Sequence, residues 1–242
     1  MGNNNKTLLN NKIDQFILRI DLAEDPTVDF RQLAEKLTPE YGDARTELHV
    51  NYNVDMQKVE VKKEEFLKYI LGIAPQITLT IDCFEKSIVL ESSHYDNNSV
   101  YKQRLAKIVK LIAEMQPEVA AQRIGMRYIN KFQCLKMSEI SKFFNTSEAS
   151  SIKNTLKQEK ISRVMLVHEY QYGDYQARVQ CGIPNKYYPL VISNYELVLD
   201  IDVFGLGIQT IDSWENAVHE YNHGAYDLFM QYVKPSLLED LR

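Results

Sequence analysis

The stretch QRIGMRYINKF, residues 122–132, decides how this chain is organised. Successive side chains of a strand point to opposite faces, so Ile124 and Met126 would face one side and Arg123 and Arg127 the other. This alternation predicts a strand with one buried face. The opposite face carries more charge than a core strand usually does, and the residues offer a structural and a functional reason for it.

The structural reason is an ion pair with a later strand. The segment ELVLDIDVF, residues 196–204, places Asp200 and Asp202 on one face. If the two strands lie near each other, Arg127 would bind one of these carboxylates through two parallel hydrogen bonds. We therefore expect Arg127 to be mostly buried and bonded to Asp200 or Asp202.

The functional reason is a cleft in which Arg123 and Arg127 receive an anionic ligand. The same polar groups would serve either purpose, and the strand pattern alone does not separate the two. The candidate network, structural or ligand-binding, comprises Arg123, Arg127, Tyr128, Asn130, Asp200 and Asp202.

The chain resembles a sporadically distributed bacterial family of uncharacterised proteins of about this length. The resemblance rests on three segments in this order: RIGMRYIN, LVLDIDVF and a helix ending in AYDLF. That family is typified by an R-x-G-x-R-Y-I-N strand and a later L-D-x-D strand. Residues on the two motifs are Arg123, Gly125, Arg127, Tyr128 and Asn130, then Asp200 and Asp202. The resemblance implies no particular activity. Its scattered distribution implies horizontally moved genes, such as defence or toxin-linked modules.

The chain departs from this family at one position. The family's last helix usually opens with a histidine ahead of an A-x-x-x-F segment. Aligned through Ala225 and Phe229, that position is Asn222 here, with His223 beside it.

Hydrophobic periodicity predicts an α+β fold with a largely antiparallel sheet. Predicted strands lie at 16–22, 46–54, 76–84, 87–95, 122–132 and 196–204, with a hairpin over 161–183 that turns at Gly173-Asp174, and predicted helices at 28–42, 99–116 and 213–233, with polar helices within 136–160.

The two halves of the chain share one order of elements. The segments IVLESSHY, residues 88–95, and LVLDIDVF, residues 197–204, also match in several positions. Either an internal duplication or a chance likeness of two buried strands explains the match. We predict two similar lobes, 13–118 and 119–242, packed as one compact unit after a disordered tail over 1–12, with long helices covering the sheets.

Composition is that of a globular protein, with 45% hydrophobic and 25% charged residues. The net charge of −5 disfavours nucleic-acid binding through the whole surface. Three cysteines without close spacing fit a reducing compartment. No segment has the apolar core of a signal peptide or the roughly 18 apolar residues of a membrane span. We therefore expect a cytoplasmic protein with no membrane partner.

The segment HEYNH, residues 219–223, matches the H-E-x-x-H pattern of zinc hydrolases. His219 and His223 are spaced to share one metal on a helix, although no third ligand follows at a diagnostic distance. We favour solvated or packing histidines and keep a zinc hydrolase as an alternative. Cys134 and Cys181 lie in apolar strands, where thiols are usually inert.

No G-x-S-x-G elbow and no P-loop appears, and GLG at 205–207 is interpreted as a turn from strand to helix. We therefore predict no catalytic residue and no cofactor, which disfavours an enzyme.

Charge is segregated: residues 121–191 carry eleven Lys/Arg against five Asp/Glu, and 192–242 carry two against nine. Aromatic surface is typical of interfaces, and the interface candidates are Tyr172, Tyr175, Tyr187 and Tyr188. We predict a non-catalytic interaction or regulatory component of a bacterial multi-component system, with a protein partner or another copy of the chain. The alternative is a single-stranded nucleic-acid-binding protein that uses Lys153, Lys157 and Lys160.

Overall fold

The structure of the protein is a computed structural model that describes residues 13–23, 28–55, 60–73, 76–93, 95, 98–158, 160–210 and 213–240. Its contacts divide the chain into two units. Unit 1 comprises residues 1–15, 127–203 and 220–242, and unit 2 comprises residues 16–126 and 204–219. Both are discontinuous in sequence, whereas the predicted lobes met at a single boundary. The internal duplication stays a prediction, and the predicted tail over 1–12 lies outside the described residues.

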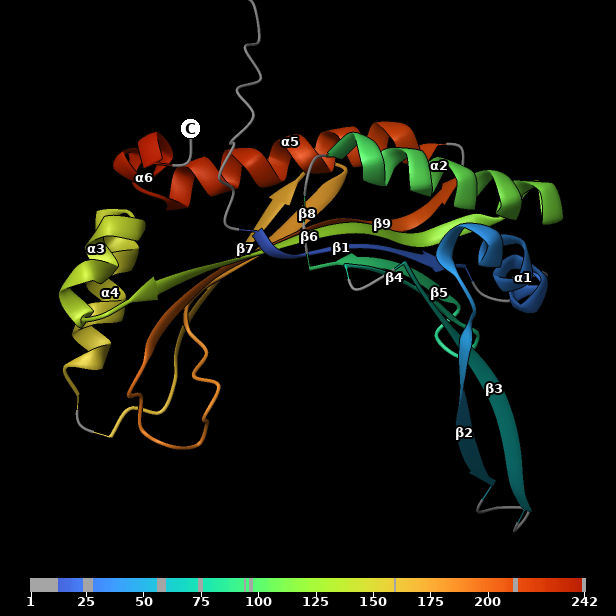
Figure 1. Ribbon diagram of the computed structural model, residues 1–242, viewed down its shortest axis with the longest axis horizontal. Coiled ribbons are helices and arrows are strands. Elements are labelled where there is room, and N and C mark those ends of the chain that lie inside the picture. Colours follow the sequence, from blue (N-terminus) through green and yellow to red (C-terminus); the bar gives the residue numbers. More distant parts are fainter. Residues whose placement is uncertain are drawn as a thin grey trace, which may run out of the picture. The chain divides into compact units, whose positions relative to one another are not determined.

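The strands form an antiparallel sheet, which confirms the predicted α+β class. They are β1 (Ile13–Leu22), β2 (Arg45–Asp55), β3 (Glu60–Ile73), β4 (Ile77–Asp82), β5 (Ser87–Ser92), β6 (Ala120–Cys134), β7 (Val164–Tyr172), β8 (Tyr175–Ile183) and β9 (Tyr195–Thr210) (Figure 1). Hydrogen bonds join them in the order β2-β3-β4-β5-β1-β6-β9-β8-β7. The pairings β1–β5, β2–β3, β3–β4, β4–β5 and β7–β8 are all antiparallel.

The two long helices predicted from the sequence are confirmed to within one residue at each end. The helices are α1 (Phe30–Tyr41), α2 (Asn98–Met115), the 3₁₀ turn η1 (Met137–Glu139), α3 (Ile140–Phe143), α4 (Thr146–Leu156), α5 (Trp214–Tyr232) and α6 (Pro235–Asp240). Within the described part of the chain, no helix is both long and apolar enough to cross a membrane.

Unit 2 is built on strands with apolar faces and two helices that cover them. Asp29 caps α1 by accepting a hydrogen bond from the Gln32 backbone N–H at 3.0 Å, and α1 ends at Gly42, whose φ of +80° favours glycine. In α2, Leu105 and Ile112 are spaced so that they lie on one face of the helix, and both are buried. The spacing of apolar residues therefore predicted this helix correctly.

Unit 1 combines the β7–β8 hairpin with parts of β6 and β9, the C-terminal part of α5 and the short helices. Backbone hydrogen bonds tie α3 and α4 to the end of α5: Asn145 N–H donates to Tyr232 O and Lys234 N–H donates to Phe143 O, both at 2.9 Å. The β7–β8 pairing brings Tyr172 opposite Tyr175, so the hairpin turns at the predicted Gly173-Asp174.

Three elements differ from the prediction. GLG at 205–207 lies inside β9, so its interpretation as a turn is wrong. The strand β3 was not predicted, because its charged residues hide the apolar ones. Helix α6 was also not predicted: it begins at Pro235, in the first turn, where the missing N–H of proline costs nothing.

The turn between β4 and β5 shows how a hairpin forms without an Asn-Gly pair. The Asp82 carboxylate accepts hydrogen bonds from the backbone N–H groups of Phe84 and Glu85, each at 3.0 Å. Lys86 then takes a φ of +51°, which L-residues other than Asn and Asp seldom adopt.

We expect Lys86→Gly to be more stable to urea than Lys86→Ala by about 0.5–1 kcal/mol. Glycine removes the Cβ clash of the left-handed conformation, and its greater freedom in the unfolded chain offsets part of that gain. Both variants lose the lysine side chain equally, so their difference isolates the backbone. An alanine variant as stable as the glycine variant would contradict this account.

Candidate functional site

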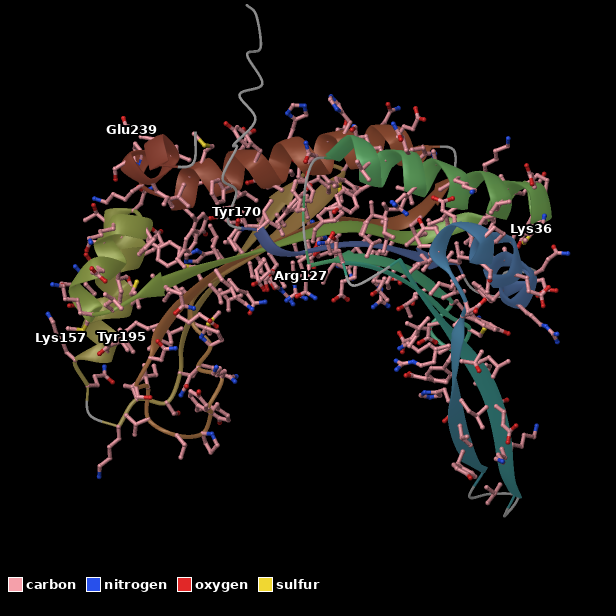
Figure 2. The ribbon with its side chains drawn as sticks, viewed as in Figure 1. Lys36, Arg127, Lys157, Tyr170, Tyr195 and Glu239 are labelled. Atoms are coloured by element: carbon pink, nitrogen blue, oxygen red, sulfur yellow. The ribbon has the colours of Figure 1, made fainter. Side chains whose placement is uncertain are left out.

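The predicted ion pair of the polar strand forms within unit 1. Arg127, which is labelled in Figure 2, donates from Nε to Asp200 Oδ1 at 2.8 Å and from Nη2 to Oδ2 at 2.6 Å. The Asp200 side chain is 9% exposed and that of Arg127 is 40% exposed. The pairing is therefore confirmed, whereas the expectation that Arg127 is mostly buried is wrong: its carboxylate partner is the buried member.

Hydrogen bonding keeps this guanidinium charged. The hydrogen bonds with Asp200 raise the pKa of Arg127, burial acts in the opposite direction, and the charges of Asp200 and Asp202 raise it further. Two of the three guanidinium nitrogens are committed to one carboxylate. This geometry favours the structural role of Arg127 over the reception of an anionic ligand.

In unit 2, Arg123 lies over an aromatic ring. Its guanidinium carbon is 4.5 Å from the centroid of the Phe204 ring, a cation–π arrangement. A Cβ on Gly125 would lie 3.2 Å from Phe204 Cβ and 3.4 Å from Arg123 Nη2. The glycine of the R-x-G-x-R segment thus leaves room for the arginine and the ring to meet.

The other face of β6 carries neutral polar groups that join it to its neighbours. Tyr128 Oη donates to Asn222 Oδ1 on α5 at 2.8 Å, and Asn130 Nδ2 donates to the Leu199 carbonyl on β9 at 3.2 Å. Both donors are buried, so their hydrogen bonds satisfy groups that would otherwise be costly inside the core. Asn222 stands where the resembled family has histidine, and here its side-chain oxygen accepts the hydrogen bond from the Tyr128 hydroxyl.

A tyrosine cluster lies between the β7–β8 hairpin and α5. Tyr232 Oη shares a hydrogen bond of 2.7 Å with Tyr170 Oη and a further one with His168 Nδ1. Burial raises the pKa of Tyr232 well above the physiological range. The hydroxyl is therefore neutral and serves as a hydrogen-bonding group.

Two predicted interface residues belong to the stacked rings of this cluster. The ring centroid of Tyr172 is 6.0 Å from that of Tyr170 and 5.0 Å from that of Tyr175, which lies 5.6 Å from Tyr221 of α5. Burial raises the pKa of both Tyr172 and Tyr175. Tyr175 thus packs against the helix, and Tyr172 extends the stack towards solvent.

The other two predicted interface residues lie on the loop between β8 and β9, residues 184–191, which we call the aromatic loop. Its large apolar side chains are between 52% and 66% exposed: Tyr187, Tyr188, Leu190 and Val191. Leu190 and Val191 were not among the predicted interface residues. The unbroken apolar run YYPLV after a buried strand was the signal that could have found them.

Asn185 holds the aromatic loop in shape. This residue is buried and has a φ of +53°, which asparagine tolerates. Its Nδ2 donates to the carbonyls of Ser162 at 2.8 Å and Leu190 at 2.7 Å, and its Oδ1 accepts from the Tyr187 N–H at 3.2 Å. The loop is therefore closed on itself and attached to the segment that precedes β7.

Cations border the aromatic loop. Arg163 lies over the Tyr188 ring, 4.4 Å from its centroid, and Lys186 over the Tyr187 ring at 5.0 Å. Arg163 Nε also donates to the Pro184 carbonyl at 3.1 Å. The segments 160–168 and 175–195 contain four Lys or Arg and no Asp or Glu, so these two stretches of the chain carry net positive charge.

The zinc alternative lacks a third ligand among the residues that the structure describes, where no group of three His, Cys, Asp or Glu gathers. His219 and His223 both lie on α5. The cysteines are free; burial raises the pKa of Cys134 to about 11 and that of Cys181 to about 12, so both thiols are protonated at neutral pH. This agrees with the prediction of inert thiols at these two positions.

We expect Arg127→Ala to lower the free energy of unfolding by about 2 kcal/mol, because it leaves the buried Asp200 carboxylate without its cation. Arg178→Ala is the matched control. Arg178 also gives two hydrogen bonds to one carboxylate, that of Glu169, but both side chains are more than half exposed. The control should lose less than about 1 kcal/mol in urea unfolding. Equal losses would contradict a structural role for the Arg127 pair.

We expect Gly224→Ala to destabilise the protein, although alanine normally favours a helix interior by about 1 kcal/mol. The new Cβ would lie 2.9 Å from Tyr175 Oη and 3.1 Å from its Cε2. The Tyr175 ring contacts the rings of Tyr172 and Tyr221, so a shift away from the new Cβ would disturb both contacts. In a Tyr175→Ala background the same change should raise the free energy of unfolding. Urea unfolding of the wild type, the two single variants and the double variant measures this change of sign. A gain in both backgrounds would contradict the proposed contact.

Comparison with models of protein families and with curated proteins finds no match to this chain. The resemblance to a sporadically distributed bacterial family stays a prediction from the quoted motifs.

Proposed function

We propose that the protein is a non-catalytic interaction component that binds a protein partner through the aromatic loop. The observation that supports this proposal is an ordered loop that keeps four large apolar side chains in water. Such surface is costly to expose unless a partner covers it, and aromatic residues in ordered surroundings are typical of binding hot spots. We also propose that it is a cytoplasmic, accessory component of a bacterial multi-component system that acts in defence.

The fixed conformation of the aromatic loop favours tight binding. The three hydrogen bonds of the Asn185 side chain restrict the backbone on both sides of Tyr187 and Tyr188. A loop that is already ordered loses little conformational freedom when it binds, so more of the contact energy contributes to affinity. This supports a preformed recognition element.

Charge indicates the chemistry of the partner. Lys160, Arg163 and Lys186 are exposed around the loop, in segments without acidic residues. An acidic surface would be attracted to this region and oriented by it. We therefore propose a partner that presents carboxylates around an apolar centre.

The aliphatic residues favour a protein over single-stranded nucleic acid. Bases bind proteins by stacking on open aromatic faces. Here cations already lie over the rings of Tyr187 and Tyr188. Leu190 and Val191 offer no ring to stack on and suit the apolar centre of a protein interface.

We expect the double variant Tyr187→Ala/Tyr188→Ala to lose a stoichiometric protein partner that the wild type retains. The protein is purified from cells that also produce the products of its neighbouring genes, and the complex is treated with nuclease before analysis. Loss of two hot-spot side chains should weaken binding by at least about tenfold.

Tyr226→Ala is the matched control, because Tyr226 is an exposed tyrosine on α5, outside the loop. It should bind like the wild type. A partner retained by the loop variant would overturn the assignment of the loop. A preparation that holds only nucleic acid, released by nuclease or by loss of Lys153, Lys157 and Lys160, would favour the nucleic-acid function instead.

A further inference from the structure

The β2–β3 hairpin of unit 2 extends beyond the rest of its sheet. Strand β3 pairs with β4 from Lys68 to Ile73, but with β2 from Glu60 to Ile70. Its outer part, from Glu60 to Leu67, therefore has β2 as its described strand neighbour and can be followed as a two-stranded ribbon in Figure 1. Isolated two-stranded ribbons are marginally stable in water.

One face of this ribbon, which we call the apolar face, carries exposed apolar side chains around the Lys63–Glu65 ion pair. Residues directly opposite in an antiparallel pair share a face, so Leu48, opposite Leu67, lies on the same side as Tyr52 and Val61. These four side chains are between 40% and 65% exposed. At the base of the hairpin the same face carries Tyr69, which is buried.

The other face is polar, and its rings are covered. His49 stacks on Phe84 with centroids 4.2 Å apart, and Phe66 meets the same ring at 5.2 Å. The rings on the polar face are therefore covered, whereas the large apolar side chains on the opposite face are exposed.

Strand β2 also has an open edge. It stands at one end of the strand order, spans 11 residues and contains no proline. Natural sheets usually protect such edges with proline, bulges or short strands, because unpaired backbone groups attract another strand. β7, at the opposite end of the order, has α4 packed against it.

We propose that β2 pairs with β2 of a second copy of this chain, antiparallel about a two-fold axis at Val50. This register is the one in which all 11 residues of the strand find a partner. It places Leu48 beside Tyr52 of the partner subunit, on the apolar face.

Residue types along β2 are complementary to the same strand reversed. Arg45, at its start, faces Asp55, at its end, and no two residues of like charge face each other. If the two-fold axis moved by one residue to His49, the register would shift by two residues and set two histidines opposite each other. This self-complementarity favours a second copy over an unrelated partner. The inference rests on the β2 edge and is independent of the aromatic loop.

The test uses single cysteines in the full chain under mild oxidation. Val50→Cys meets its own copy at the axis, where facing Cα atoms lie about 4.5–5.5 Å apart, within disulfide range. It should form a covalent dimer. Leu48→Cys alone should not, because two copies of residue 48 are about 13 Å apart along the strand. Mixing Leu48→Cys with Tyr52→Cys should restore the cross-link, and wild type reports any background from Cys83.

Light scattering of the wild type gives the second measurement. A dimer that dissociates on dilution is expected, and Tyr187→Ala/Tyr188→Ala should leave it unchanged. A monomer at all concentrations overturns the proposal. So does a dimer in which neither Val50→Cys nor the mixed pair cross-links, whatever the outcome of the partner-binding experiment.

Discussion

The two-residue alternation along β6 is the constraint on which unit 1 depends. It directs Tyr128 and Asn130 towards α5 and β9 and directs Arg127 towards Asp200. A slip of one residue would exchange the faces, burying the guanidinium under the helix and exposing the core side chains. The ion pair and the neutral hydrogen bonds therefore depend on one register, and each opposes the slip that would break the other. This explains why a core strand carries so much hydrogen-bonding capacity.

Features with a local cause were predictable from the sequence. The apolar stripe of α2, the turn at Gly173-Asp174 and the faces of β6 each follow from spacing within one segment. An ion pair of Arg127 with Asp200 or Asp202 was also predictable. A charge on a half-buried strand needs a partner of opposite charge, and few carboxylates lie on another predicted strand. The exposure of Arg127 was misjudged, since which partner is buried depends on neighbours distant in sequence.

Features that depend on distant contacts were not predictable. Lys62, Lys63, Glu64 and Glu65 give β3 no strand-like pattern, and only pairing with β2 makes that segment a strand. Nor does any property of the YQYGDYQ segment indicate that Tyr175 packs over Gly224 of a helix nearly fifty residues later, whereas Tyr187 stays in water. Whether a tyrosine of this region is packed or exposed therefore depends on its tertiary contacts and not on the local sequence.

The aromatic loop and the β2 edge are held in shape by different interactions. We therefore expect them to bind different kinds of partner. The aromatic loop is fixed by hydrogen bonds of the Asn185 side chain, and the backbone N–H groups of Tyr187, Tyr188 and Leu190 are bonded within the loop. Its exposed side chains are therefore the groups that can contact a partner. Such a surface recognises another surface by shape and charge. The β2 edge presents backbone groups in a regular row, and main-chain hydrogen bonds discriminate little between strands. Specificity at that edge must come from the residue pattern, and a pattern complementary to its own reverse selects an identical strand.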